Sequence, residues 1–451
     1  MNSSPMNMRD GSVVSEKMEP VIPPLVCRDV KATKRRFNCN NGSAFSSVGN
    51  EIRIPISGNF VLDNKNVNLC CKVNITGANN ALTTADFSWA GLFSQIRVEA
   101  GSGSSIILEQ IDDPGLWANF LYQYTWNNST LATQNSKQLS AIAQPAAATS
   151  LIDKDGTAVT CVTGALTQPI NIVLDLSQFM GIFYANSGIP LYDTAGLTVV
   201  FVMNTLGSIA ATTTTAAVTK IEVENPYITC SCLEGGEKYE SALKEMKSKN
   251  GEVSIMFNTC RRYVQSTSGS GTKSLLIGEK AKSVLGFVAM ARDTAAIVLP
   301  AAYSNSTSIF PTLQNHVYQI AGENYPVQPM TGASCEGIDE AYDLYSHVSR
   351  RHDAGGLLAR VQASTLTPAD GTAQTALFVD DEGQSHVLAV NLAKCGPHEN
   401  YWGKGKNLSG SSLNTYLNVD YTTLNAQTVT IFSIFQQKVH IDAMGNMSNE
   451  I

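Results

Sequence analysis

The sequence predicts an all-β fold of two consecutive β-sandwiches with short helices inserted between strands. Three observations predict this class. The chain has 451 residues, more than one ordinary hydrophobic core supports, so two large domains fit its length best. Short runs typical of strands, separated by clusters of Gly, Asn, Ser and Thr, fill both halves. The last three runs of each half follow in the same order, which indicates that one architecture occurs twice.

Residues 1–36 mix polar residues, prolines and charges without periodicity, and we interpret them as a flexible N-terminal arm. The arm holds seven basic and four acidic residues, whereas the whole chain has a net charge of −7. A chain with that balance does not coat nucleic acid with most of its surface. The one basic cluster consists of Lys31, Lys34, Arg35 and Arg36, and it is the candidate for an electrostatic contact with an anionic partner. A solvated tether without such a role is the alternative.

Residues 37–235 form the first predicted sandwich. Its clearest strand has Ile52, Ile54 and Ile56 alternating with Arg53 and Pro55, as one buried face requires. Pro55 indicates an edge strand, because proline cannot donate a backbone hydrogen bond. Further strands are expected at Val67–Ile75, Ser94–Glu99, Ser105–Glu109, Ile170–Leu176 and Lys220–Ile228.

The run Leu197–Met203 differs from these strands because it is apolar on both faces. A strand of that kind is covered on two sides, so we expect it in the interior of a sheet.

Residues 236–250 are predicted to be a helical connector. Tyr239, Leu243 and Met246 share one helical face, and the helix is expected to stop at Asn250-Gly251. Beyond it the strand pattern restarts, so residues 251–442 form the second predicted sandwich and residues 443–451 a C-terminal tail. Its strands are expected at Thr272–Ile277, Ser283–Ala291, His316–Ile320, Ala376–Val379, His386–Leu392, Leu413–Tyr421 and Thr428–Ile441.

Each sandwich also contains one short segment with helical spacing. In the first sandwich these residues are Trp117, Phe120, Leu121 and Tyr124; in the second they are Ile338, Ala341, Tyr342 and Tyr345. Each half is therefore expected to insert one helix between its strands.

No catalytic or metal-binding motif emerges from the sequence, and we predict neither an enzyme nor a cofactor. His440 and Asp442 share a strand face as a dyad would, but an exposed pair without a role is the favoured interpretation. The acidic neighbours Asp112-Asp113 and 380–382 could hold calcium, although acidic residues are common in turns. The glycine-rich segments 101–104 and 269–274 are interpreted as turns between strands.

The ten cysteines follow no zinc spacing and are interpreted as mostly reduced core thiols. The N-terminus lacks the apolar run of a signal peptide, and no later stretch is apolar enough to span a membrane. Export and membrane spanning are therefore not expected.

Several segments, taken in order, resemble double jelly-roll major capsid proteins, with the nearest likeness to those of polinton-like viruses, virophages and related small DNA viruses. The segments are Glu51-Ile-Arg-Ile-Pro-Ile, Gly91-Leu-Phe-Ser-Gln-Ile-Arg-Val-Glu-Ala-Gly-Ser-Gly-Ser, Leu108-Glu-Gln-Ile, Gly188-Ile-Pro-Leu, Lys282-Ser-Val-Leu-Gly-Phe and Tyr318-Gln-Ile-Ala-Gly-Glu-Asn-Tyr-Pro-Val-Gln-Pro. The resemblance covers residues 37–442, and segments 293–312 and 396–411 match nothing in the family.

The resemblance implies two consecutive jelly-roll sandwiches and a viral structural protein. It implies homotrimers of pseudo-hexameric outline that assemble with neighbouring trimers, minor capsid proteins and penton proteins into an icosahedral capsid, inside the host cell. The arm is then expected on the inner side of the virion, where its basic cluster would meet the genome or an inner membrane. The alternative is a carbohydrate-binding or adhesive protein of two sandwiches, for which residues 398–402 are the loop candidate.

Overall fold

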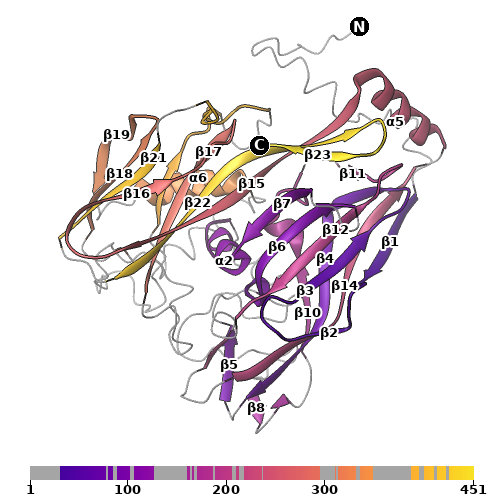
Figure 1. Cartoon of the computed structure of the whole chain (residues 1–451), viewed down its shortest axis with the longest axis horizontal. Helices are drawn as coiled ribbons and strands as arrows, with labels where there is room; N and C mark the ends of the chain where they lie inside the picture. The colour runs from indigo at the N-terminus through magenta and orange to yellow at the C-terminus, as the bar shows by residue number, and fades with distance from the viewer. Residues whose placement is uncertain are drawn as a thin grey trace.

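The structure is a computed structural model. It describes residues 31–77, 80–84, 89–101, 106–125, 160–162, 165–166, 170–185, 188–205, 210–212, 218–235, 237–294, 310, 313–331, 336–348, 387–395, 401–410, 414–422 and 426–451. Two β-sandwiches lie side by side in it, with helix α2 (Pro114–Thr125) between them (Figure 1).

The first sandwich consists of two antiparallel sheets whose main strands have the orders β1-β14-β4-β10 and β3-β12-β6-β7. In chain order its eight strands are β1 (Lys31–Asn38), β3 (Glu51–Ile56), β4 (Val61–Gly77), β6 (Phe93–Ala100), β7 (Ile107–Asp112), β10 (Ile170–Asp175), β12 (Leu197–Met203) and β14 (Val218–Glu234).

The second sandwich also has two antiparallel sheets, whose main strands have the orders β15-β22-β17-β20 and β16-β21-β18-β19. In chain order its strands are β15 (Glu252–Thr267), β16 (Gly271–Ile277), β17 (Val284–Asp293), β18 (Leu313–Ile320), β19 (Glu323–Thr331), β20 (Leu388–Asn391), β21 (Thr415–Tyr421) and β22 (Gln427–Asp442).

Both sandwiches have one topology. When their strands are counted from first to eighth, each has one sheet ordered first, eighth, third, sixth and one ordered second, seventh, fourth, fifth. Eight antiparallel strands arranged in two such sheets form a jelly roll. The chain is therefore a double jelly roll, which confirms the predicted fold class. We call the two units the first and the second jelly roll.

The remaining elements are short strands and short helices. Strands β2 (Ala44–Phe45), β11 (Ile189–Pro190) and β23 (Met447–Glu450) extend the main sheets. A separate sheet has the order β13-β5-β8-β9, with β13 (Ala210–Thr212), β5 (Asn80–Thr84), β8 (Thr160–Val162) and β9 (Ala165–Leu166). Short 3-10 helices occupy η3 (Trp89–Leu92) and η4 (Leu176–Gln178).

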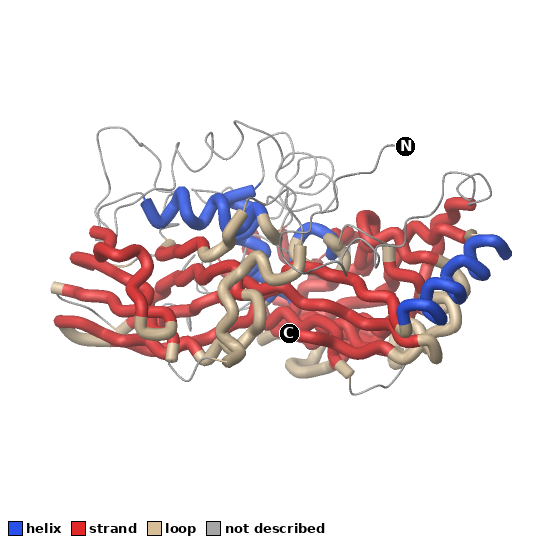
Figure 2. The backbone as a smooth tube through the Cα atoms, turned by 90° about the horizontal axis from the view of Figure 1, so that it is seen from above, coloured by secondary structure: helices blue, strands red, loops and turns tan. Residues whose placement is uncertain are grey.

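The three predicted helices are confirmed. Helices α2 (Pro114–Thr125) and α6 (Glu336–Ser346) each follow the fifth strand of their jelly roll. Helix α5 (Glu237–Asn250) joins the two units and lies at one end of the molecule (Figure 2). It stops at Gly251, whose positive φ of 79° favours glycine.

Two predictions about individual strands are also confirmed. Strand β3, which carries Pro55, is an edge strand, and β12 lies between β3 and β6 with nearly all its residues buried. Leu197, Val199 and Phe201 of β12 belong to the largest hydrophobic cluster in the described residues, which fills the first jelly roll and includes residues of the second, such as Phe432. The strand expected at Ala376–Val379 lies outside the described residues.

The predicted boundary of the arm is wrong for its last six residues. Lys31–Arg36 belong to β1, the first strand of the first jelly roll, which pairs along its whole length with β14. Its burial pattern explains the error. Both faces of this edge strand are largely exposed and only Phe37 packs against the core, so the sequence has no apolar alternation to reveal it. Residues 1–30 lie outside the described residues.

Candidate functional site

The four predicted contact residues lie on β1, and Arg35 is already engaged within the chain. Its Nη2 lies 2.5 Å from Oε1 of Glu234, and its guanidinium lies over the ring of Phe60, 5.1 Å from the centroid. Hydrogen bonds from Arg35 and Thr33 hold the pKa of the Glu234 carboxyl below its usual value. Arg35 therefore links the edge strand β1 to its neighbour β14 in the first jelly roll.

Arg36 points to the opposite side of β1, away from the core. Its Nε donates a hydrogen bond of 2.8 Å to Asn38, and its guanidinium lies 3.7 Å from the ring centroid of Tyr227. Lys31, Lys34 and Arg36 are exposed. None of them forms an ion pair with a residue in the described part of the chain.

The largest buried side chain between the two jelly rolls is Trp117 of α2. Its ring lies 5.6 Å from that of Tyr345 on α6 and 5.1 Å from that of Phe432 on β22. Its Nε1 donates a hydrogen bond of 3.0 Å to the carbonyl oxygen of Phe179. Trp117 therefore links the helix of the first jelly roll to a helix and a strand of the second, and we call this contact region the junction.

A buried carboxyl lies at the same junction. Glu109 of β7 accepts hydrogen bonds from the backbone amides of Gly181 and Ile182, at 2.8 and 2.9 Å, and from Oγ1 of Thr259 on β15, at 2.6 Å. Burial raises the pKa of Glu109 to about 7, although these three hydrogen bonds favour the charged form. A Cβ at Gly181 would overlap the carbonyl oxygen of Asn258, so only glycine allows this approach.

An ion pair and a further hydrogen bond also cross the junction. Nη2 of Arg262 on β15 lies 3.2 Å from Oδ2 of Asp113, which directly precedes α2. Gln437 donates a hydrogen bond to the carbonyl oxygen of Leu108 on β7. The strand β7 of the first jelly roll is thus held against β15 and β22 of the second.

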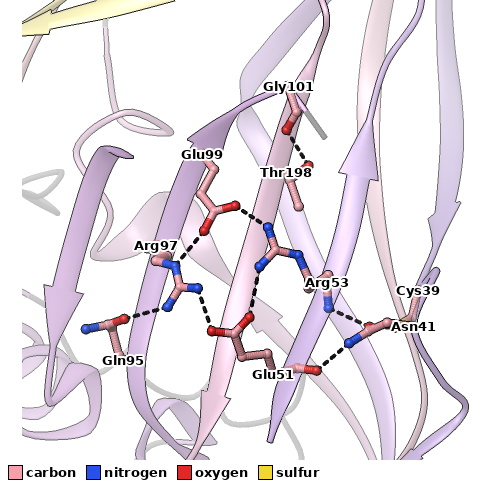
Figure 3. A network of polar contacts seen from close by, with 9 residues as sticks. All are labelled: Cys39, Asn41, Glu51, Arg53, Gln95, Arg97, Glu99, Gly101 and Thr198. Atoms are coloured by element: carbon pink, nitrogen blue, oxygen red, sulfur yellow. Dashed lines mark hydrogen bonds and ion pairs between the residues drawn. The ribbon is translucent and has the colours of Figure 1, made fainter. Parts of the chain in front are cut away.

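A closed ring of four charged residues lies on the outer face of the sheet β3-β12-β6-β7 (Figure 3). We call it the ion-pair ring: Glu51, Arg53, Glu99 and Arg97. Each guanidinium contacts both carboxylates. The hydrogen bonds and charges of Arg97 and Arg53 lower the pKa of Glu51, whereas those of the two glutamates raise the pKa of Arg97.

The ion-pair ring explains why the middle strand is apolar on both faces. Val200 of β12 is paired with Arg53 on one side and Arg97 on the other. It is 0% exposed, although it is not a member of the hydrophobic cluster that contains Val199 and Phe201. The aliphatic stems and the paired charges therefore cover Val200 from outside the sandwich.

His440 and Asp442 do not form the dyad that their spacing permits. Nδ1 of His440 lies 2.7 Å from Oε1 of Glu252, and its Nε2 lies 3.2 Å from Oε2 of Glu450. Asp442 instead accepts hydrogen bonds from Met444 and from Asn446 in the turn before β23. His440 therefore ties the C-terminal strand to the second jelly roll.

The acidic residues considered for calcium binding have partners within the chain where they are described. Asp113 pairs with Arg262 and Asp112 accepts from Gln95, and no group of three metal-ligating side chains occurs in the described ranges. Residues 268–270 connect β15 to β16, as the turn interpretation predicted, whereas 102–105 and 380–382 lie outside the described residues. In the described part of the chain no helix is long and apolar enough to span a membrane.

The aromatic loop considered for carbohydrate binding is partly described. The ammonium of Lys438 lies 4.2 Å from the ring centroid of Trp402, and Gln436 donates to the carbonyl oxygen of Tyr401. One face of Trp402 is thus occupied by the chain itself.

The sequence reasoning missed the ion-pair ring and the junction. The ring had a detectable signal, because Glu51 and Arg53, like Arg97 and Glu99, are opposite charges two residues apart on predicted strands and so share a face. The junction had no such signal, since Glu109 meets Thr259 only after the two jelly rolls have packed together.

The fold defines a class, the double jelly roll, and solved structures of that class are similar to this chain over nearly its whole length. The major capsid protein of Faustovirus has a TM-score of 0.57 and 11% identity, with 91% of this chain and 90% of that chain covered. A chain of the Sputnik virophage has a TM-score of 0.55 and 12% identity, covering 93% and 88%. The mavirus major capsid protein has a TM-score of 0.51 and 8% identity, covering 100% and 95%.

At these identities the likeness concerns the fold. No family model matches the sequence. No curated protein matches it either.

Proposed function

We propose that this chain is a major capsid protein that forms homotrimers of pseudo-hexameric outline, which assemble with neighbouring trimers into an icosahedral shell around a viral genome. The observation that carries the proposal is the same eight-strand order occurring twice in one chain, in an arrangement similar to that of viral major capsid proteins. The low charged fraction of 15% agrees with a surface that is largely covered by protein. In this function the chain catalyses no reaction, requires no cofactor and resides in the virion after assembly in the host cell.

The other partners in this proposal are minor capsid proteins, penton proteins and an anionic layer under the shell, either the genome or an inner membrane. Because Arg35 is paired with Glu234, we assign the electrostatic contact chiefly to Lys31 and Lys34, together with the arm that precedes them. Each copy contributes few charges, but many copies in one shell make the total attraction large.

Light scattering on the purified protein tests the trimer. The expected mass is about three times the 48.3 kDa of one chain, and the expected shape in negative stain is six-lobed. A protein that stays monomeric at the highest soluble concentration contradicts the proposal. If the monomer instead binds immobilised glycans, the carbohydrate-binding alternative replaces it.

Charge reversal tests the electrostatic contact. Lys31→Glu with Lys34→Glu should lower the amount of nucleic acid or lipid that remains with assembled particles, and added salt should have the same effect on the unaltered protein, because exposed charges are screened. The matched control is Lys249→Glu with Lys220→Glu, which reverses two exposed charges elsewhere. Equal retention by both variants contradicts this assignment.

A further inference from the structure

The C-terminal strand β23 contacts both jelly rolls. It pairs with the end of β22 in the second jelly roll and lies next to β7 of the first (Figure 1). Nδ2 of Asn449 donates a hydrogen bond of 2.6 Å to the carbonyl oxygen of Ile107 on β7. Met447 is buried in the hydrophobic cluster to which both jelly rolls contribute. The contacts that hold β23 in place therefore also help to hold the two jelly rolls together.

The backbone pairing of β23 is short, so side chains must contribute to its attachment. The strand has only four residues, and a peripheral strand with so few hydrogen bonds opens at little cost. Glu450 supplies two of its side-chain contacts. Oε1 of Glu450 accepts a hydrogen bond of 2.6 Å from Nζ of Lys282, and Oε2 lies 3.2 Å from Nε2 of His440 on β22.

The ring of His440 lies between two carboxylates. Its Nε2 faces Glu450 on β23, whereas its Nδ1 lies 2.7 Å from Oε1 of Glu252 on β15. Oγ of Ser254 is also close to Nδ1, at 2.8 Å. Only the imidazolium form has a proton on both nitrogens, so only this form can donate to both carboxylates.

A neutral ring of His440 has a single proton to donate. If the proton is on Nδ1, it serves Glu252, and Glu450 faces a lone pair. If the proton is on Nε2, Glu450 keeps its hydrogen bond, Ser254 donates to Nδ1 and Glu252 faces a lone pair. In either tautomer the positive charge between the two carboxylates is lost, so the attraction that holds Glu450 becomes weaker.

The other charged groups around the ring are Lys438 and Asp442 on β22 and Lys282 before β17. The hydrogen bond from Lys282, together with that from His440, lowers the pKa of Glu450. Hydrogen bonds within its own turn lower the pKa of Asp442. Of all these groups only an imidazole ordinarily changes its charge between about pH 5 and pH 8.

We infer that Glu252, His440 and Glu450 form a pH-sensitive latch: the protonated ring of His440 holds β23 in place in acid, and β23 opens more readily once the ring is neutral. We call these three residues the C-terminal latch. It acts within one chain and does not rest on the proposed function. A monomeric protein would contradict the proposed assembly and leave the latch unaffected.

Hydrogen exchange followed by mass spectrometry tests the latch on the full chain. The protection factor of the peptide 443–451, which corrects for the intrinsic exchange rate at each pH, should be about five- to tenfold higher at about pH 5.5 than at about pH 8. The edge strand β16 is the internal reference, because neither it nor its partner β21 contains a histidine. Its protection should change much less.

Three variants separate the latch from an ordinary contact. His440→Gln removes the titrating ring and should abolish the pH dependence of β23. Glu252→Gln leaves β23 and the ring unchanged but should weaken the pH dependence, because a neutral ring then satisfies the one remaining carboxylate. Lys282→Gln is the matched control: it removes the other contact of Glu450, so protection should fall at both pH values and the pH dependence should remain.

Two results would overturn the inference. One is equal protection of β23 at both pH values in the unaltered chain. The other is a pH dependence that persists in His440→Gln, which would assign it to another group such as Glu109, whose pKa of about 7 lies in the same range. Melting temperatures close to that of the unaltered protein show that the variants are folded, and Glu252→Gln decides the question if His440→Gln does not fold.

Discussion

The two jelly rolls share a strand order, but the outer faces of their corresponding sheets carry different side chains. In the first, the middle strand β12 presents Val200 outward under the ion-pair ring. In the second, the corresponding strand β21 presents Asn418, which accepts a hydrogen bond of 2.7 Å from Ser274 and is paired on its other side with Val317. The outer face therefore carries paired charges in the first jelly roll and hydroxyl and amide groups in the second, although the strand order is the same.

The comparison indicates that inward-facing residues determine the shared fold. In both sheets the residues that alternate with Val200 and Asn418 are buried apolar ones, such as Val199 and Leu417. Outward-facing residues can differ because water or a local network satisfies them. Substitutions at the junction should therefore cost more than substitutions in the ion-pair ring, and substitutions on the open surface should cost least.

The largest effect is expected at the junction. Trp117→Ala removes a buried ring that contacts Tyr345 and Phe432, and such truncations cost about 3–5 kcal/mol of unfolding free energy. Urea unfolding should show this loss in both jelly rolls together. If only the first unfolds earlier and the second keeps its midpoint, the junction is not what couples them.

A second effect depends on pH and belongs to Glu109. Its pKa is raised to about 7 in the folded chain, so the folded state binds the proton more tightly than the unfolded state does. The resulting stability is present below about pH 4 and is lost as the pH rises through about 7, to an extent of about 3 kcal/mol.

Glu109→Gln should remove most of this dependence, because its side chain stays neutral. Unfolding free energies at about pH 5 and pH 8 provide the measurement. Equal slopes for the variant and the unaltered chain would mean that Glu109 is charged in the folded state throughout this range.

A smaller effect is expected in the ion-pair ring. Arg53→Ala leaves the nearly buried Glu99 with one arginine instead of two and uncovers Val200, which should cost about 1–2 kcal/mol. Its counterpart in the second jelly roll, Ser274→Ala, removes an exposed hydrogen bond and should cost about 0.5 kcal/mol or less. Chemical denaturation of the two variants in parallel sharpens the comparison; equal losses would show that the ring contributes no more than an ordinary surface contact.

Much of the fold could be predicted from the sequence because it depends on local periodicity. The alternating isoleucines predicted β3, and the run that is apolar on both faces predicted β12 at its observed bounds. The helical spacing of apolar residues predicted α2 and α6. Strand β19 was not predicted because it contains Pro326 and Pro329. Proline is rare inside strands, so its presence favoured a loop.

The site was less predictable because it depends on contacts between distant segments. The basic cluster was found, but whether Arg35 and Arg36 lie on a tether or on a strand depends on pairing with β14, about 200 residues away. Glu109 and Trp117 looked like ordinary members of a strand and a helix, since their partners lie in the other jelly roll.

Electron cryomicroscopy of the purified oligomer tests the central claim most directly. The account predicts three chains around one axis, with six jelly rolls in a ring. Monomers, or a two-fold dimer in which identical surfaces meet, would contradict it.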